Sequence, residues 1–484
     1  MGASQFTPKV LAVAPTSLTG SRLLLLLSAL AAGLALPAAA QTPPASDKGK
    51  EQGSVSYFRD IRPILQRTCQ GCHQPATKSG DLVLTTYEAF MAGGAKGKVV
   101  VPSQADQSLV IGYLKGDVKP QMPFGGTPLP PEQIELFRRW IGEGAKDDTP
   151  ATAKSVLAPG KPPVYHAAPI INALAYSPDG KVLAVSGYRE ILLHSSDGSG
   201  LLARLPGISD KITSLAFSPD GSLLAAVGGT PATFGEVQLW EVAQRKLKRS
   251  LTLTNDTLFG ASFSPDGSKL AFGGADNSIY VVEVETGKQL LKMSHHDGWV
   301  FGTVFSQYGS QIISVGRDRA VKLSNVAGGI FIENINQLKG ELVCIARQPK
   351  RDNVLVGGED GIPFLYMIHR PRSLVIGDTS TLIREFEKQD GPVISVAFSP
   401  DGQVIAVGTA AEDIRLYKTD TGERVASFKG HQGGIYAVTF RPDGEQWAAA
   451  GFDGTVRIYD LKSGQLAKAF VPVPLETRVI SMVK

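Results

Sequence analysis

The tetrapeptide Ser-Pro-Asp-Gly recurs along this 484-residue chain and constrains its fold more than any other feature. Its four complete copies, one close variant and two degenerate copies start, in chain order, at Ser177, Ser218, Ser264, Ser306, Gln348, Ser399 and Arg441. The mean spacing between these starting points is 44 residues. A unit of this length cannot bury its apolar face alone and has to stack on its neighbours. We therefore expect an array of seven stacked units.

Each copy of the tetrapeptide lies between two apolar runs that have the composition of strands. In the second unit, residues 212–217 precede the turn, residues 223–227 follow it, and residues 236–240 form a third run. A short polar turn such as residues 420–423 then leads to a fourth run. Four strands per unit and seven units predict an all-β, seven-bladed propeller over residues 170–484.

This region resembles the WD-repeat family. The best copy has Gly430-His431 at its start, Asp453 before its third strand and Tyr459-Asp460 at the end of that strand. Most other blades lack these signatures. We therefore expect the tetrad of these blades, the hydrogen-bonded set of four side chains typical of a WD repeat, to be incomplete. The resemblance implies a platform that binds a protein ligand. Residues 164–166 or 478–483 are each candidates for the strand that latches the ring, and an eighth partial blade is an alternative.

A second feature, Cys69-Gln70-Gly71-Cys72-His73, carries the chemistry. This is the C-x-x-C-H attachment signature of a c-type haem, in which two thiols form thioethers and the histidine ligates the iron. A zinc site, a redox dithiol and a structural disulfide are the alternatives. The remaining cysteine, Cys344, lies in an expected propeller strand and is predicted to be a buried, inert thiol. We expect one covalent haem c.

The sixth iron ligand is expected to be a methionine. His73 is the only histidine between the end of the predicted leader and His166, which excludes a second histidine ligand from within this region. Met122 lies between two prolines in a loop, whereas Met91 follows Phe90 on a probable helix and suits the core. A thioether ligand also raises the reduction potential. We therefore favour Met122 as the ligand, with a five-coordinate iron as the alternative.

Residues 57–146 resemble the planctomycete-type cytochrome c domain. The matching pieces are Phe58-x-x-Ile61-x-Pro63-Ile64-Leu65, the C-x-x-C-H motif, Gly80-x-Leu82-x-Leu84, Gly93-Gly94, Pro102 through Ser108-Leu109, Met122-Pro123 and Trp140-Ile141-x-x-Gly144-Ala145. Phe124 stands where that family usually has a second proline. The resemblance implies a small all-α domain with His73 and Met122 as axial ligands. Apolar spacing likewise predicts one helix before the motif and another through Ile134 and Trp140.

The expected organisation is therefore multidomain. Residues 1–40 read as a secretory signal peptide, with a basic start, a leucine-rich run and small residues before Gln41. A flexible segment (41–52), the haem domain (53–148), a proline-rich linker (149–169) and the propeller (170–484) follow. Cleavage near Ala40 predicts a periplasmic or otherwise extracytoplasmic protein. No later segment of the sequence is apolar enough to be expected to span a membrane.

Charge and motifs narrow the function further. The net charge is only +4, and neither large region carries a strong excess of one sign, which argues against nucleic acid as a partner. The prediction is an electron carrier whose propeller docks a protein and whose redox partner is unidentified. A haem-linked enzyme and a redox or gas sensor are the alternatives, although no second haem motif or convincing acid–base cluster was found. His295-His296-Asp297 is a weaker candidate for a metal site.

Overall fold

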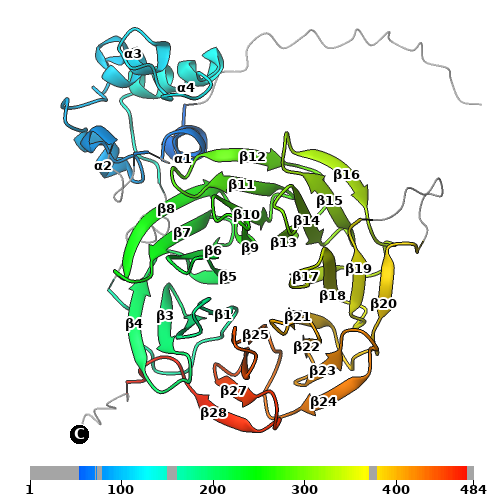
Figure 1. Cartoon of the computed structure of the whole chain (residues 1–484). Helices are drawn as coiled ribbons and strands as arrows, with labels where there is room; N and C mark the ends of the chain where they lie inside the picture. The colour runs from blue at the N-terminus through cyan, green and yellow to red at the C-terminus, as the bar shows by residue number, and fades with distance from the viewer. Residues whose placement is uncertain (1–53, 71, 74–78, 150–160, 370–378, 477–484) are drawn as a thin grey trace, which may run out of the picture. The chain divides into compact units, whose positions relative to one another are not determined.

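The computed structural model describes residues 54–70, 72–73, 79–149, 161–369 and 379–476. The predicted signal peptide, the flexible segment and most of the predicted linker lie outside these residues. The described part of the chain contains a helical region followed by seven four-stranded antiparallel sheets arranged as a ring (Figure 1). The seven-bladed propeller is confirmed, and a small helical region precedes it.

The helical region consists of short helices joined by loops. Its elements are the π-helical turn η1 (Tyr57–Ile61), α1 (Arg62–Thr68), the 3-10 turn η2 (Ser79–Asp81), α2 (Tyr87–Ala92), the 3-10 turn η3 (Ala105–Gln107), α3 (Leu109–Lys115) and α4 (Pro131–Gly142). Proline occupies the first turn of both α1 and α4, where its missing N–H costs no helical hydrogen bond. Ser56 caps η1 by accepting a hydrogen bond from the Arg59 amide.

The core of the helical region centres on Trp140 of α4. Its ring lies 5.5 Å from that of Tyr57 and 5.9 Å from that of Phe90, measured between centroids. Ile61, Ile64 and Leu65 are buried in the same cluster, as the helical spacing predicts. Phe58 differs from its neighbours, because Tyr57 takes the buried place while Phe58 lies under the Arg62 guanidinium, 4.9 Å from it.

The first four blades follow in chain order. Their strands are β1 (Leu174–Tyr176), β2 (Val182–Ser186), β3 (Glu190–Ser195) and β4 (Leu201–Pro206); β5 (Lys211–Phe217), β6 (Leu223–Thr230), β7 (Phe234–Glu241) and β8 (Lys246–Thr254); β9 (Leu258–Phe263), β10 (Lys269–Gly274), β11 (Ile279–Glu283) and β12 (Gln289–Met293); β13 (Val300–Phe305), β14 (Gln311–Gly316), β15 (Val321–Asn325) and β16 (Ile330–Asn334).

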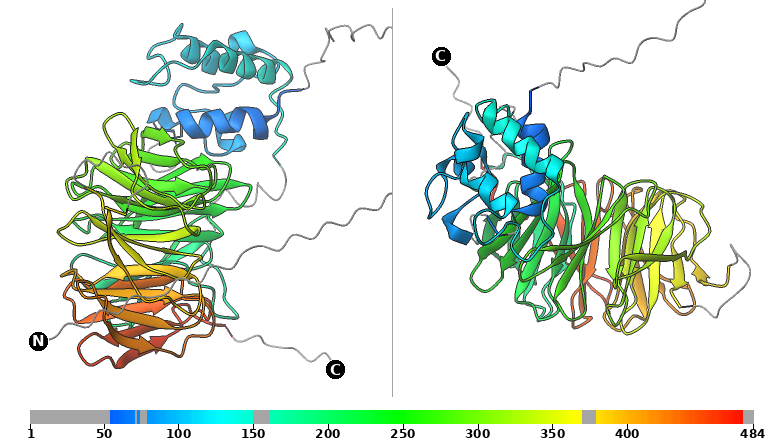
Figure 2. Two further views of the ribbon diagram at one scale, coloured as in Figure 1. Left: turned by 90° about the vertical axis from the view of Figure 1, so that its right-hand side faces the viewer. Right: turned by 90° about the horizontal axis from the view of Figure 1, so that it is seen from above.

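The last three blades repeat the pattern. Their strands are β17 (Leu342–Arg347), β18 (Asn353–Gly358), β19 (Phe364–Met367) and β20 (Leu382–Glu385); β21 (Val393–Phe398), β22 (Val404–Thr409), β23 (Ile414–Lys418) and β24 (Arg424–Phe428); β25 (Ala437–Phe440), β26 (Gln446–Ala450), β27 (Val456–Asp460) and β28 (Leu466–Phe470). Figure 2 shows the ring edge-on, with the strands running across its thickness. The second and third strands of each blade are largely buried between neighbours, which explains their continuous apolar sequence.

The Ser-Pro-Asp-Gly turns do more than join two strands, because they also touch from blade to blade. The serine hydroxyl donates to the aspartate, as in Ser218 to Asp220 at 2.5 Å, and the glycine adopts a positive φ, +74° at Gly221. A Cβ placed on Gly221 would lie 3.4 Å from Pro178 of the preceding turn. Equivalent contacts recur around the ring and include Gly180 against Pro442, which links the first blade to the last.

The ring also closes through segments that lie 310 residues apart. Tyr165 forms a parallel bridge with Leu475, and the Glu476 amide donates to the Tyr165 carbonyl at 2.8 Å. Tyr165, which falls within the range predicted for the linker, is buried in a cluster shared by the first and last blades. The chain before β1 and the chain after β28 thus pair with each other, while each blade keeps four strands that are contiguous in sequence. Residues 478–483 lie outside the described residues.

Candidate functional site

The C-x-x-C-H motif begins where α1 ends. The Cys69 amide donates to the Leu65 carbonyl at 2.9 Å, which continues the helical pattern to the first cysteine. The amides of Cys72 and His73 then donate to the Cys69 carbonyl at 3.2 and 3.1 Å. One tight turn therefore holds Cys69, Cys72 and His73 together, as their spacing in sequence requires.

The two thiols have different surroundings. Cys69 is partly buried against the helical core, and burial, with a smaller contribution from Cys72, raises the pKa of its thiol to about 12. Cys72 is exposed. Both are free thiols in the described structure, so neither is engaged in a disulfide there. One sulfur faces the core and the other remains accessible.

His73 offers an unused ligand atom. Its Nδ1 is buried and has no hydrogen-bond partner among the described residues. Burial lowers the pKa of the imidazole, and the nearby backbone of Ser79 and Leu82 opposes this effect only in part. The neutral imidazole that burial favours is the form that binds a metal ion. A buried ring nitrogen without a partner fits the role of an iron ligand.

A second segment fastens this turn from the side. The Gln70 side chain is buried, and its Nε2 donates to the Leu84 carbonyl at 2.7 Å. The Leu84 amide donates in turn to the His73 carbonyl at 2.9 Å, and the Ser79 amide donates to the Cys72 carbonyl at 3.1 Å. These bonds fix the backbone on both sides of the cysteines. Gln70 was not recognised as part of the site from the sequence, because position alone does not reveal which way it points.

Met122 lies on the loop that follows α3. Its amide donates to the Tyr113 carbonyl at 2.9 Å, which ties the loop to that helix. Its side chain is partly buried and packs against the same core cluster as Cys69. Met91, on α2, packs against this cluster too. The structure therefore brings both methionines to the core that Cys69 contacts, with Met122 on a loop and Met91 inside a helix.

The set of donors fits a haem of the c type. One turn provides two free thiols and an imidazole with an unpartnered buried nitrogen, and a loop provides a thioether. Of these groups, Cys69 and Met122 pack against the same apolar core. Among the described residues, no three His, Cys, Asp or Glu side chains gather as a metal-binding group. Cys69, Cys72, His73 and Met122 are the residues that would hold the haem.

The weaker metal candidate at His295-His296 has a different explanation. His296 is buried, with Nδ1 at 2.8 Å from Asp318 Oδ1 and Nε2 at 2.8 Å from Ser314 Oγ. His295 lies 3.0 Å from Ser324 Oγ. Both ring nitrogens of His296 are thus used in the hydrogen-bonded network of the fourth blade. Cys344 is on β17, where burial raises the pKa of its thiol to about 12, in agreement with an inert thiol.

Three blades that lack the full tetrad signature carry a buried acidic side chain instead. Glu190 begins β3, Glu236 lies within β7 and Asp413 directly precedes β23, and all three side chains are buried. Each is bonded: Arg204 binds Glu190 at 2.7 Å, and the hydroxyls of Ser209 and Ser250 each donate to Glu236 at 2.6 Å. A buried acidic side chain needs such partners, and burial raises the pKa of Glu236, whose partners are uncharged. These blades thus have polar networks built from residues other than those of the tetrad, and the acidic residue beside or within an apolar run was the sequence signal that could have indicated them.

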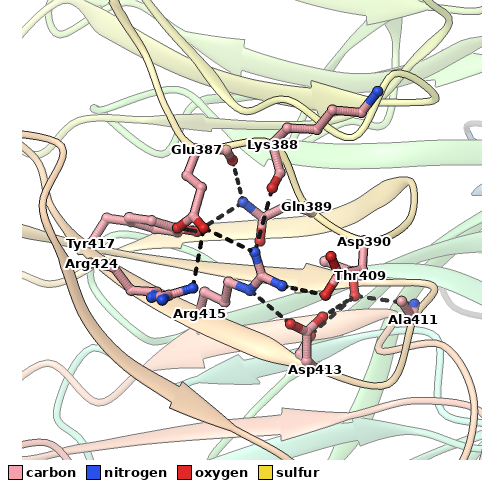
Figure 3. Close-up of polar contacts among 10 residues, drawn as sticks. All are labelled: Glu387, Lys388, Gln389, Asp390, Thr409, Ala411, Asp413, Arg415, Tyr417 and Arg424. Carbon is pink, nitrogen blue, oxygen red and sulfur yellow. Dashed lines mark hydrogen bonds and ion pairs between the residues drawn. The ribbon is translucent and has the colours of Figure 1, made fainter.

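The sixth blade has the most extensive of these networks (Figure 3). Arg415 donates to Asp413 at 2.8 Å and to Asp390 at 2.5 Å. Thr409 donates to the other oxygen of Asp413 at 2.7 Å. The Gln389 amide donates to the Tyr417 hydroxyl at 2.9 Å and links the loop before β21 to β23. This network connects the loop before β21 to β22 and β23. It also provides partners for the buried charges of Asp413 and Arg415.

The fold and these segments define a WD-repeat β-propeller protein with an amino-terminal helical region. WD-domain G-beta repeat models match residues 199–230, 245–283, 287–324 and 422–460, and the model of the anaphase-promoting complex subunit 4 WD40 domain matches residues 378–440. The planctomycete cytochrome C model matches residues 69–123, from the first motif cysteine to the residue after Met122. These matches fit the predicted fusion of a segment similar to planctomycete-type cytochrome c with a WD-repeat propeller.

Among curated proteins, the chain is similar to Protein FIZZY-RELATED 3 of Arabidopsis thaliana. The two are 27% identical over 152 residues, which is 31% of this chain and 30% of that relative. The chain therefore spans less than a third of the relative's length. None of the helices in the described ranges is long and apolar enough to cross a membrane.

Proposed function

We propose that this protein is an exported one-electron carrier. One haem c is attached through Cys69 and Cys72 and has His73 and Met122 as axial ligands. The propeller serves as a protein-docking platform, a role that its WD-repeat family supports. The observation that carries the proposal is the single turn that gathers Cys69, Cys72 and His73 beside the core contacted by Met122.

A haem held there would supply an iron that alternates between the ferric and ferrous states. The protein's part is to hold that iron in a fixed environment. His73 and Met122 belong to segments fastened by the backbone hydrogen bonds to Leu84 and Tyr113. Buried side chains of α1 and α4 belong to the apolar core that Cys69 and Met122 contact. Such surroundings would limit the access of water to a bound haem and favour its less charged, reduced state.

The extracytoplasmic location belongs to the same proposal. Haem is normally attached to C-x-x-C-H outside the cytoplasm, so a carrier of this kind needs an export signal. The basic, leucine-rich stretch within residues 1–40 supports export, with cleavage near Ala40. We expect the mature protein in the periplasm or beyond it.

Optical spectroscopy of the full chain, produced together with a haem c maturation system, tests the proposal. We expect one haem that resists extraction by acidified acetone, a methionine–iron absorption band in the oxidised state and no binding of carbon monoxide by the reduced state. Cys69→Ser combined with Cys72→Ser should abolish covalent haem. Cys344→Ser is the matched control and should leave attachment unchanged.

Different results would contradict different parts of the proposal. A haem-free protein despite competent maturation would reject the haem assignment and reopen the zinc and disulfide alternatives. Covalent haem that binds carbon monoxide readily would reject Met122 as a firm ligand and favour a gas sensor or a catalytic site. Covalent haem that binds carbon monoxide would still support Cys69 and Cys72 as the attachment residues.

A further inference from the structure

The outer strand of the fourth blade, β16, exposes an apolar surface. It lies at the outer rim of the ring and pairs only with β15 among the described strands (Figure 1). Its first three residues are apolar, and Ile330 is 64% exposed, Phe331 41% and Ile332 42%. The outer edge of such a strand offers backbone N–H and C=O groups to a further strand. β16 therefore combines an open strand edge with three apolar side chains.

The other outer strands carry a protection that β16 lacks. Each contains at least one basic residue: Arg204 in β4, Lys246 in β8, Lys292 in β12, Arg384 in β20, Arg424 in β24 and Lys468 in β28. Charged side chains on an edge strand, lysine above all, oppose its pairing with another chain. β16 has no basic residue, and its one charged residue is Glu333. A bulge, which can also protect an edge, occurs in all seven outer strands and does not distinguish β16.

The exposed edge is held in place by its own blade. The centre of the Phe331 ring lies 5.6 Å from that of the His295 ring and 5.8 Å from the Lys322 ammonium. Directly after the strand, the Ile335 amide donates to the Val321 carbonyl at 2.9 Å. The edge is thus fixed before any partner arrives, so pairing with another strand would cost little conformational entropy on this side.

We propose that β16 pairs antiparallel with β16 of a second copy of this chain, across a two-fold axis at Phe331. The triplet Ile330-Phe331-Ile332 reads the same in both directions. Antiparallel pairing about its centre therefore sets isoleucine opposite isoleucine and phenylalanine opposite phenylalanine, and such cross-strand pairs stabilise a sheet. Glu333 would face Gly329 of the second copy, so no like charges meet. A different protein would need a matching apolar strand, which every copy of this chain already supplies.

The size of the contact limits its strength. A strand of five residues is about 17 Å long. Its pairing buries less than the roughly 800 Å² per partner that a stable complex needs. We therefore expect a reversible dimer with a Kd on the order of 10 μM. The two-fold contact is closed after two copies, because it occupies the exposed edge of both.

Analytical ultracentrifugation of the full-length protein over a range of concentrations tests the proposal. The first double variant, Ile330→Lys with Ile332→Lys, sets lysine opposite lysine and should weaken the dimer at least about tenfold. The second, Ile330→Lys with Ile332→Glu, sets lysine opposite glutamate in the antiparallel register. It should associate about tenfold more tightly than the first, because opposite charges then meet across the axis. Both variants leave Phe331 and its contacts within the blade intact.

The matched control lies on the outer strand of the sixth blade. Val425→Lys with Ser427→Lys makes the same kind of change at two exposed positions of β24 and should leave the dimer unchanged. Circular dichroism and the thermal midpoint of each variant identify any folding defect. Amide hydrogen exchange of the parent protein needs no variant, and residues 330–334 should exchange more slowly as the protein concentration rises. The proposal is independent of the haem, since none of these residues belongs to the candidate haem site.

Three results would overturn the proposal. The first is a parent protein that stays monomeric at every concentration, which would leave the edge to a strand of a different protein. The second is a dimer that the first double variant does not weaken, or one that gives residues 330–334 no protection from exchange. The third is an equal loss of affinity in both double variants, which would exclude antiparallel pairing across Phe331.

Discussion

Asp413 and Arg415 form a 2.8 Å ion pair in which both side chains are almost fully buried. They flank the first residue of β23, and Arg415 extends the pair to Asp390 in the loop before β21. The pair thus replaces the tetrad that the sixth blade lacks. It holds that loop and the turn between β22 and β23 in one arrangement.

Breaking this pair from one side should destabilise the propeller strongly. Arg415→Met leaves the carboxylate of Asp413 buried without its cation, and such a loss costs about 3–5 kcal/mol. Arg415→Met with Asp413→Asn should recover part of this, because the buried charge is gone. Arg424→Met is the control, since Arg424 is about half exposed and its one ion pair, to Glu387, should contribute less than about 1 kcal/mol. Urea unfolding followed by circular dichroism measures the difference, and equal losses for Arg415→Met and Arg424→Met would contradict it.

The contact between adjacent Ser-Pro-Asp-Gly turns can be tested with one methyl group. Gly221→Ala places a Cβ at a φ of +74° and 3.4 Å from Pro178. We expect a loss of about 1–2 kcal/mol in the free energy of unfolding, from the left-handed backbone conformation and the tighter contact. Gly200→Ala is the matched control, because its Cβ would meet no atom within 4 Å and its φ is not positive. Thermal unfolding of both variants should show a lower midpoint only for Gly221→Ala.

His431 makes the stability of the propeller depend on pH. Burial, helped by the nearby Arg457 and opposed by Asp453, lowers the pKa of its imidazole from 6.5 to about 4. The unfolded chain therefore takes up a proton at a higher pH than the folded chain. The stabilising contribution is complete above about pH 6.5 and is lost as the pH falls towards 4, at about 1.4 kcal/mol per pH unit. Urea unfolding at several pH values should show this slope, and His431→Gln should reduce it.

An exposed histidine provides the comparison for this slope. His369→Gln is the control for the removal of a surface histidine, because the His369 side chain is 60% exposed and lies 3.3 Å from Asp352. A slope that both substitutions reduce equally would assign the effect to the loss of a histidine in general. A slope that neither reduces would place the titrating group elsewhere.

The fold was predictable where its cause is local. A Ser-Pro-Asp-Gly turn needs a particular backbone conformation and a serine–aspartate hydrogen bond, so its spacing alone indicated seven blades. Ring closure was predictable in part, because residues 164–166 were one of the two expected latches and Tyr165 does pair with Leu475. The identity of its partner was not predictable, because the two segments share no sequence pattern. The buried carboxylates were missed for a related reason. An acid inside an apolar strand reads as an irregularity until the partner, such as Arg204 for Glu190, is seen beside it.

In the candidate site, too, the local features were predictable and those that depend on tertiary packing were not. The spacing of Cys69, Cys72 and His73 predicts that they share one turn, and the hydrogen bonds to the Cys69 carbonyl agree. The sequence could not predict that Cys69 is partly buried while Cys72 is exposed, because this difference depends on how α1 packs. The roles of Tyr57 and Phe58 were also exchanged, since two adjacent aromatic residues satisfy the helical spacing almost equally well.

One pair of variants can decide whether Met122 or Met91 is the axial ligand. Met122 lies on a loop tied to Tyr113, whereas Met91 lies within α2, and both contact the core beside Cys69. If Met122 is the axial ligand, Met122→Ala should keep the covalent haem, remove the methionine–iron band and open the iron to carbon monoxide. The reduction potential should fall, by a fraction of the roughly 0.8 V range that axial ligands set. Met91→Ala should leave spectrum and potential nearly unchanged and only reduce stability, by about 2–3 kcal/mol for a partly buried methionine. Redox titration of both variants with carbon monoxide addition distinguishes them, and the reverse pattern would move the ligand to α2.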